Sequence, residues 1–255
     1  MKKLHDINIV KKEIVDWTAQ VVADAGMKNL VLGISGGADS TVLAKVATLA
    51  VGPEHVYGIF MPNGVQVDLD DAKRAAKAAG VVNTIEANLA MAVLAAKATV
   101  KLALPNRQDL SVQANTNITP HVRTAVETAI AQTIGDSLII CTANLSELMM
   151  GYFTMWADMG SIAPMANLTK SEVRELGLAL GLPEDLVLKT PADGLSGQSD
   201  EEKMGFTYKQ IDTFIRGGID ELSEGVRTAL ADRMKRMEYK RKMLNIPAYL
   251  PAFSG

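Results

Sequence analysis

The chain has 255 residues, of which 48% are hydrophobic and 22% charged, and its formal net charge is −3. This composition excludes a low-complexity or disordered protein, and the slightly negative charge argues against broad nucleic-acid binding, which needs a basic face. No apolar run reaches the roughly 18 residues of a membrane span, and the N-terminus lacks an apolar signal core. Cys141 is the only cysteine. We therefore expect a cytoplasmic protein without an internal disulfide, and neither a nucleic-acid nor a membrane partner.

The first part of the chain alternates between helical and strand-like patterns. Apolar residues recur at helical spacing in some segments and form short continuous runs, typical of buried strands, in others. Helices are expected over residues 6–26, 41–50, 69–79, 89–102 and 122–134, and strands over 29–34, 55–61, 83–87 and 137–142. Residues 103–118 are polar, contain Pro105 and are expected to form a loop. This alternation predicts a doubly wound α/β fold, with a mostly parallel sheet covered by helices on both faces.

The last third of the chain has a different character. A helix is expected over residues 169–180, where Thr169 and Glu172 have the spacing of a capping box. Residues 189–206 are rich in Gly, Pro, Ser and Asp and predict a loop, and further helices are expected over 208–216 and 223–243. We therefore expect one domain over residues 1–255, whose last part, about 208–255, is a helical extension.

The strongest chemical signal is the run Leu32-Gly33-Ile34-Ser35-Gly36-Gly37-Ala38-Asp39-Ser40, between a predicted strand and a predicted helix. Glycines allow backbone amides to approach an oxyanion, and the start of a helix adds unpaired amides and a positive dipole end. Ser35 and Ser40 can donate hydrogen bonds to phosphate, whereas Asp39 is suited to hold Mg²⁺. The Gly-Lys-Ser/Thr ending of the other common phosphate loop is missing. The alternative is a plain glycine turn.

This run resembles the pyrophosphate loop of the N-type ATP pyrophosphatases, which share an adenine nucleotide alpha hydrolase-like fold and cleave ATP between the α and β phosphates. Segments of the second half resemble one branch of them, the ammonia-dependent NAD synthetases. These segments are residues 142–147, 151–154, Asp158, Pro164, 167–174, 189–202 and 205–208. The resemblance covers roughly residues 10 to 250.

The resemblance implies an ATP site, a metal site and two catalytic residues. The implied ATP-binding residues are Gly33, Ile34, Ser35, Gly36, Gly37, Ala38, Asp39, Ser40, Thr142 and Lys170. Asp39 and Glu147 match the Mg²⁺ ligands of the family, and Asp39 and Lys170 are the implied catalytic residues. Judged alone, Glu147 is a carboxylate at a helix start, and Lys170 is a solvated surface charge.

The implied reaction has two steps. The carboxylate of nicotinic acid adenine dinucleotide attacks the α-phosphorus of ATP and releases pyrophosphate, and ammonia then converts the acyl-adenylate to the amide, NAD, and AMP. The resemblance also implies a homodimer. A chain of 255 residues is too short to include an appended glutaminase of the usual size, so we expect free ammonia, or ammonia from a separate protein, as the nitrogen source.

The acid-substrate side departs from the family pattern. The positions that match substrate-binding residues are His121, Arg123, Asp158, Tyr239 and Lys240. His121 stands where the family has an arginine, and Met155 where it has a cation. A downstream aspartate is shifted or absent around Ser161, and a family His-Lys pair is matched by Tyr239-Lys240.

Several interpretations of these departures remain open. Either Arg123, Lys240 and Arg241 compensate, or the chain accepts a different acid or is impaired. Judged alone, Arg123 and Lys240 are solvated charges on helices, and His121 caps a helix. Alternative functions are another adenylating amide ligase, a tRNA-modifying pyrophosphatase, and an adenine-nucleotide-binding protein without catalysis.

Overall fold

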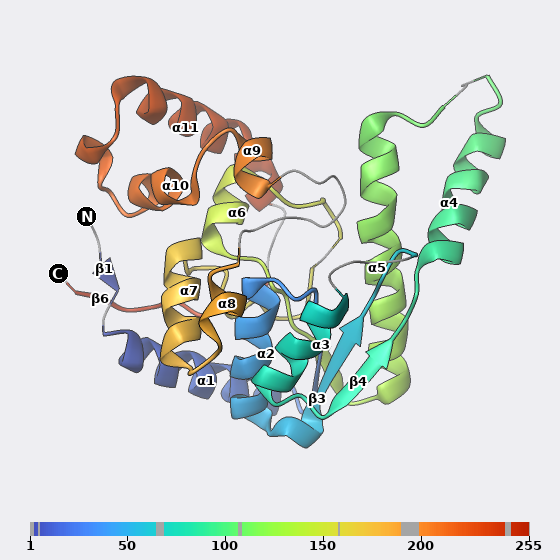
Figure 1. The fold of residues 1–255 in the computed structure, drawn as a ribbon, viewed down its shortest axis with the longest axis horizontal. Helices are drawn as coiled ribbons and strands as arrows, with labels where there is room; N and C mark the ends of the chain where they lie inside the picture. The colour runs from blue at the N-terminus through green and yellow to red at the C-terminus, as the bar shows by residue number, and fades with distance from the viewer. Residues whose placement is uncertain are drawn as a thin grey trace.

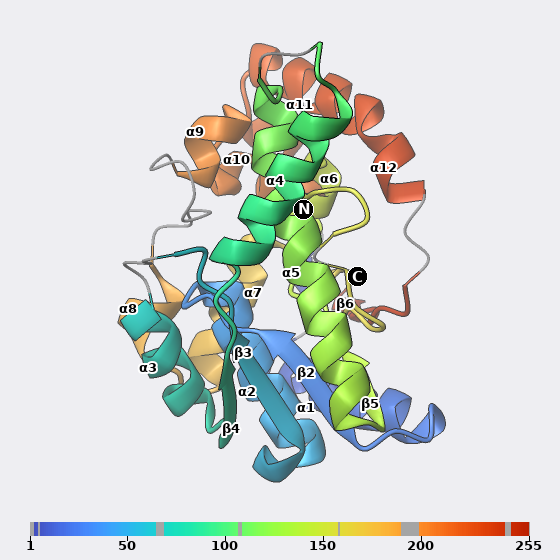
Figure 2. The same ribbon diagram turned by 90° about the vertical axis from the view of Figure 1, so that its right-hand side faces the viewer.

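The computed structural model describes residues 3–4, 6–64, 69–106, 109–157, 159–189, 199–242 and 246–254. Its main sheet is parallel and has the strand order β4-β3-β2-β5 (Figures 1 and 2). In this sheet Leu30 is in register with Val56 on one side and Leu138 on the other. The strands are β2 (Asn29–Gly33), β3 (Val56–Phe60), β4 (Asn83–Glu86) and β5 (Ser137–Ile139). Because the strands are parallel, the segments that follow β2 and β5 leave the sheet at the same edge.

Helices cover both faces of this sheet. Leu30 and Leu32 belong to a core with the helices of one face, whereas Val31 belongs to the core of the other, as the two-residue period of a strand requires. The helices of the second face are α4 (Ala90–Ala103) and α5 (Val112–Ile134) (Figure 2). The helices of the first face are α1 (Ile7–Asp24), α2 (Ala38–Val51), α3 (Leu69–Ala79), α7 (Lys170–Ala179) and α8 (Glu184–Val187). The predicted doubly wound α/β fold is confirmed.

The C-terminal helices pack on a core of their own. Met150, Tyr208 and Leu230 are buried there. The helices are α6 (Leu145–Met150), α9 (Asp200–Met204), α10 (Tyr208–Ile215), α11 (Glu224–Arg236) and α12 (Glu238–Lys242). Figure 1 shows α6, α9, α10 and α11 grouped apart from the strands β3 and β4. Short 3₁₀ helices lie at Pro53–His55 and Ile219–Glu221, and β1 (Lys3–Leu4) pairs antiparallel with β6 (Phe253–Ser254).

The structure corrects three sequence expectations. Helix α5 begins at Val112, ten residues before the expected start, and continues through Pro120, so the expected loop is partly helical and His121 lies inside a helix instead of capping one. Residues 200–204, expected in a loop, form α9 because Ser199 and Glu202 make a capping box. The expected helix 223–243 is divided at Met237. Among the described residues, no helix is long and apolar enough to cross a membrane.

Candidate active site

The Ser-Gly-Gly run forms a compact turn between β2 and α2. Gly36 has a φ of +80°, and a Cβ placed on it would lie 2.7 Å from the backbone nitrogen of Ala72 at the start of α3. Only glycine fits such a position, for both its backbone angle and its packing. The Ser35 and Ser40 hydroxyls lie 3.1 Å apart, and Ser40 Oγ also donates to the Gly37 carbonyl at 3.1 Å. The turn is therefore organised by its own side chains.

Three helix starts meet where this turn leaves the sheet. Asp39 lies in the first turn of α2, Glu147 in the first turn of α6, and Lys170 is the first residue of α7. The Lys170 ammonium donates to Asp39 Oδ2 and lies 3.4 Å from Glu147 Oε1. Its side chain is 3% exposed, and the two carboxylates are less than one fifth exposed. The structure thus brings together the two expected metal ligands and the expected ATP-binding lysine.

Burial and charge together set the protonation of this cluster. Burial raises the pKa of Glu147 to about 7; Asp39 adds to the rise, and the charge of Lys170 opposes it. For Lys170, burial acts to lower the pKa, but the charges of Asp39 and Glu147 outweigh it, so the pKa is raised. The lysine therefore keeps its charge, and because two acidic groups lie beside this one ammonium, the cluster favours a further cation.

Residues that were not assigned from the sequence hold the two carboxylates. Asn144 is fully buried. Its side-chain Nδ2 donates to Asp39 Oδ1 at 3.2 Å, and its side-chain Oδ1 accepts from the Glu147 backbone nitrogen at 3.0 Å. The second hydrogen bond caps the start of α6. The Tyr208 hydroxyl lies 3.2 Å from Glu147 Oε1 and 3.4 Å from Asp200 Oδ2. The position of Asn144 three residues before Glu147 is a sequence signal for a cap. Tyr208 lies in the segment 205–208 that resembles the family, but no local pattern indicates its contact with Glu147, because the two residues are 61 positions apart.

The remaining expected ATP residues lie along the same edge. Ile34 is buried, and its backbone nitrogen donates to the Ile59 carbonyl at 2.9 Å, so it joins the turn to β3. Gly37 is the cap residue of α2, and Ala38 begins that helix, three residues earlier than expected. Thr142 follows β5 and is half-buried.

The expected acid-substrate residues are more scattered than the cluster around Lys170. His121 is exposed and Arg123 half-buried, both on α5. Asn117, one turn before His121, accepts a hydrogen bond of 3.3 Å from Thr154. On α12, Tyr239 is 55% exposed. Asp158 lies outside the described residues.

Lys240 of α12 is engaged with the backbone. Its Nζ donates to the carbonyls of Gly151 at 2.8 Å and Phe153 at 2.6 Å, and it lies over the ring of Phe153. Burial lowers the pKa of Lys240, and the charge of Arg233 adds to the effect. To bind substrate, this ammonium would have to give up its hydrogen bonds to the Gly151 and Phe153 carbonyls.

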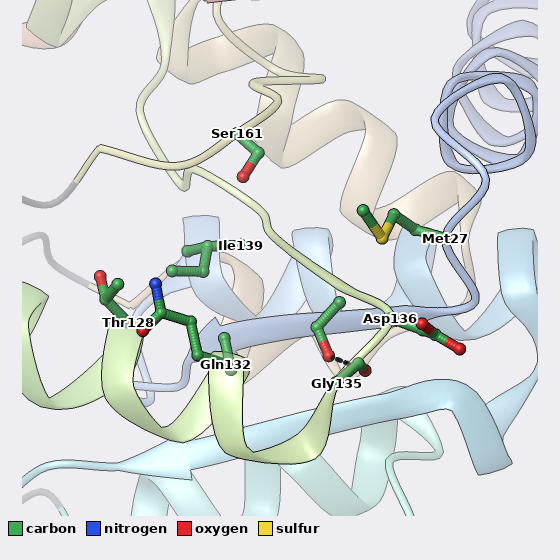
Figure 3. A pocket seen from close by; sticks show the side chains of 9 residues that line it. Met27, Thr128, Gln132, Gly135, Asp136, Ile139 and Ser161 are labelled. Carbon is green, nitrogen blue, oxygen red and sulfur yellow. Dashed lines mark hydrogen bonds between the residues drawn. The ribbon is translucent and has the colours of Figure 1, made fainter.

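A pocket of about 360 Å³ lies elsewhere, at the beginning of β5 (Figure 3). Thr128 and Gln132 of α5 line it together with Met27 and Ser161, and Ser137 Oγ donates to the Gly135 carbonyl at 2.7 Å beside it. Because it sits where β5 starts, it is separate from the edge that carries Asp39 and Lys170.

Comparison with known proteins assigns the chain to a family. The NAD synthase family model matches residues 10–244. The NH(3)-dependent NAD(+) synthetase from Pyrococcus horikoshii is 32% identical to this chain, and the match covers 93% of this chain and 95% of that protein. The NH(3)-dependent NAD(+) synthetase from Carboxydothermus hydrogenoformans is 36% identical, and the match covers 92% of this chain and 96% of that protein. The solved structure of an NMN synthetase from Francisella tularensis has a TM-score of 0.83 and 28% identity, covering 95% of this chain and 99% of that one. The chain therefore belongs to the NAD synthase family.

Proposed function

We propose that this protein is an ammonia-dependent NAD synthetase, which uses ATP to convert nicotinic acid adenine dinucleotide and ammonia to NAD, AMP and pyrophosphate. The observation that carries the proposal is the buried cluster of Lys170, Asp39 and Glu147 at the mouth of the Ser-Gly-Gly turn. Membership of the NAD synthase family, and relatives named NH(3)-dependent NAD(+) synthetase, support it.

The turn and Lys170 form the proposed site for the ATP phosphates. The first amides of α2 lack partners within the helix and can donate to phosphate oxygens, and the dipole of α2 favours negative charge there. The Lys170 ammonium donates to Asp39, which lies in the first turn of α2, so a positive charge is held at the start of this helix. Its proposed role is to neutralise charge that develops on the phosphates as the bond between the α and β phosphates breaks.

The residues around Lys170 also fit a Mg²⁺ ion. An ammonium already lies between the oxygens of Asp39 and Glu147, so this place favours a cation, and carboxylate oxygens are the ligands that Mg²⁺ prefers. Within the described ranges, no group of three or more His, Cys, Asp or Glu side chains could hold a metal alone, so ATP oxygens would complete the ligand set. When bound, the ion would neutralise the charge of the departing pyrophosphate.

The proposed reaction needs no covalent bond to the protein. A carboxylate oxygen of the acid attacks the α-phosphorus, the bond to the β-phosphate oxygen breaks, and pyrophosphate leaves. Ammonia then attacks the acyl carbon, loses a proton, and displaces AMP. The one cysteine, Cys141, is 3% exposed in the core, which agrees with chemistry based on positioning and charge neutralisation.

The α4–α5 pair supports a homodimer. Met91, Leu94 and Leu102 follow one face of α4 and are 76%, 60% and 81% exposed, and Val112 at the start of α5 is 85% exposed. Exposed apolar side chains that gather in this way mark protein interfaces. Figure 2 shows α4 and α5 side by side along the length of the molecule, where a second copy could cover them.

A second candidate substrate is the smaller acid nicotinic acid mononucleotide. The absence of the expected cations at His121 and Met155 favours it, because an acid without the adenylate half needs fewer cationic partners. The similarity to the NMN synthetase of Francisella tularensis supports the same alternative.

One assay distinguishes these substrates. The protein is incubated with ATP, Mg²⁺, ammonium and either acid, and AMP and the amide product are followed together. We expect AMP and NAD in equal amounts with the dinucleotide. AMP formed with the mononucleotide alone would reassign the substrate, and ATP binding without AMP from either acid would show a nucleotide-binding protein instead of an enzyme.

A further inference from the structure

A buried carboxylate next to the proposed site belongs to none of the groups discussed above. Asp212 lies on α10 and is 7% exposed. Its Oδ1 accepts a hydrogen bond of 2.5 Å from Ser146 Oγ, and its Oδ2 accepts from the Ser171 backbone nitrogen at 2.8 Å and from Ser171 Oγ at 2.6 Å. Both oxygens of this carboxylate therefore act as acceptors for donors on two other helices.

These donors are the immediate neighbours of the site residues. Ser146 precedes Glu147 on α6, and Ser171 follows Lys170 on α7. Ser146 Oγ also accepts a hydrogen bond of 2.9 Å from the Lys170 backbone nitrogen, so a single hydroxyl joins α6 to α7 and then to Asp212. Both Ser146 and Lys170 are buried.

We propose that Asp212 is a positioning residue of the NAD synthetase reaction, which sets the separation of Glu147 and Lys170 by holding the starts of α6 and α7 on its two oxygens. This inference rests on the proposed function. It also gives the C-terminal helices a role, because α10 then carries the group that fixes the geometry of the phosphate site from outside it.

The chemistry of the contact requires a carboxylate. Burial raises the pKa of Asp212, and the hydrogen bonds from Ser146 and Ser171 oppose the rise. An asparagine of the same size presents an oxygen to only one of the two serines. An NH₂ group facing Ser171 would lose the hydrogen bond from its backbone nitrogen, and an NH₂ group facing Ser146 would force the Ser146 hydroxyl to accept where it now donates. One of the two helix starts would then be released from α10.

The structure offers a matched contact that separates positioning from general packing. Arg216, which follows α10, donates to the two oxygens of Glu172 on α7 at 2.7 and 2.6 Å. This pair joins the end of α10 to α7 only, whereas Asp212 joins α10 to both α6 and α7. It is similarly buried, and its two hydrogen bonds involve neither Ser146 nor Ser171. Loss of the Arg216 contact should weaken the packing of α10 without moving Glu147 relative to Lys170.

The test compares Asp212→Asn with Arg216→Gln at a temperature where circular dichroism shows both variants to be folded. For Asp212→Asn we expect kcat to fall at least about tenfold and the Mg²⁺ concentration for half-maximal rate to rise, with the KM for the acid unchanged. For Arg216→Gln we expect a lower melting temperature and wild-type values of kcat and Mg²⁺ activation. Ser146→Ala should reproduce the Asp212→Asn effect, and the double variant should be no worse than either single one.

Two outcomes would overturn the inference: an unchanged Mg²⁺ dependence in Asp212→Asn, or an equal change in Arg216→Gln. If Asp212→Asn does not fold, Ser171→Ala replaces it in the test. This variant keeps the hydrogen bond from the Ser171 backbone nitrogen to Asp212, so kcat and Mg²⁺ activation should change in the same direction but less. If the wild type forms no AMP from either acid, the proposed function fails. The positioning role is then tested by Mg²⁺-dependent binding of a fluorescent ATP analogue, which Asp212→Asn should weaken and Arg216→Gln should not.

Discussion

The phosphate side and the acid side of the proposed site are built differently. Around Lys170 the side chains are buried and joined by hydrogen bonds from several helices, and their positions match the family pattern. On the acid side, His121 and Tyr239 are exposed and Lys240 binds backbone carbonyls, and it is here that the chain departs from the family pattern. The contrast suggests that chemistry common to the family depends on a rigid centre, whereas the choice of acid depends on residues that can change without disturbing it.

The sharpest way to challenge this contrast is to change Asp39. In Asp39→Asn one of the two proposed Mg²⁺ ligands is changed and Lys170 loses its nearest carboxylate. AMP formation should fall by more than about a hundredfold, since loss of partners that only orient metal ligands already costs 10–100-fold. Asp70→Asn removes an exposed carboxylate at the start of α3 and should keep wild-type activity. Normal AMP formation by Asp39→Asn would refute the metal assignment.

A smaller effect is expected at Gly36. An alanine there would be strained by the positive φ, and its Cβ would lie 2.7 Å from the backbone of Ala72. We expect a loss of about 1–3 kcal/mol in the free energy of unfolding. Because the turn must shift, the KM for ATP should also rise. Gly37→Ala is the matched control for stability alone, because Gly37 is itself an expected ATP-binding residue; its φ is −82° and its Cβ would meet only Ser35 Oγ at 3.4 Å. Urea unfolding would measure the stability of both variants, and rates at varied ATP concentration would give the KM for ATP of the Gly36 variant. An equal loss of stability in the two variants would contradict the prediction.

On the acid side, His121→Arg tests the departure from the family pattern. A guanidinium restores a bidentate donor at an exposed position of α5. If nicotinic acid adenine dinucleotide is the substrate, its KM should fall at least about tenfold, since one charged hydrogen bond contributes roughly 1.5–3 kcal/mol. The KM for ATP should not change. An altered ATP affinity would show that the two sides of the site are not independent.

The smallest effect concerns Lys189, whose Nζ lies 2.7 Å from Asp71 Oδ2 at the start of α3, beside Gly36. The hydrogen bond from Lys189 lowers the pKa of Asp71, so the stabilisation is present at neutral pH and is lost as the pH falls and Asp71 becomes protonated. Lys189→Met should cost less than about 1 kcal/mol at pH 7, because both side chains are about one third exposed. Urea unfolding at lower pH should show this difference shrink, whereas a difference independent of pH would exclude the ion pair as its cause.

The sequence predicts the sheet and the glycine turn well because both depend on local patterns. Apolar runs locate β2 and β3 to within about a residue, and α3 begins and ends where it is expected. The start of α5 is missed because its first turns extend away from the sheet: Val112 is 85% exposed, so the apolar periodicity of a packed helix is absent there.

The candidate site is predicted only in part, because some of its contacts join segments that are far apart in the sequence. Asp39, Glu147 and Lys170 lie in motifs that resemble those of a family, and their meeting follows from the parallel sheet. Asp212 and Tyr208 act on these motifs from α10, and the contact between Asp212 and Ser146 spans 66 residues. The pattern of α10 predicts an amphipathic helix but carries no information about which distant group its polar residues will reach.

The ammonium of Lys170 places a positive charge of the protein itself where a divalent ion is proposed to bind. It lies between Asp39 and Glu147 and offsets part of the repulsion between these two acidic groups. Treatment with a chelator should therefore arrest turnover while leaving the melting temperature unchanged, and added Mg²⁺ should restore activity without a refolding delay.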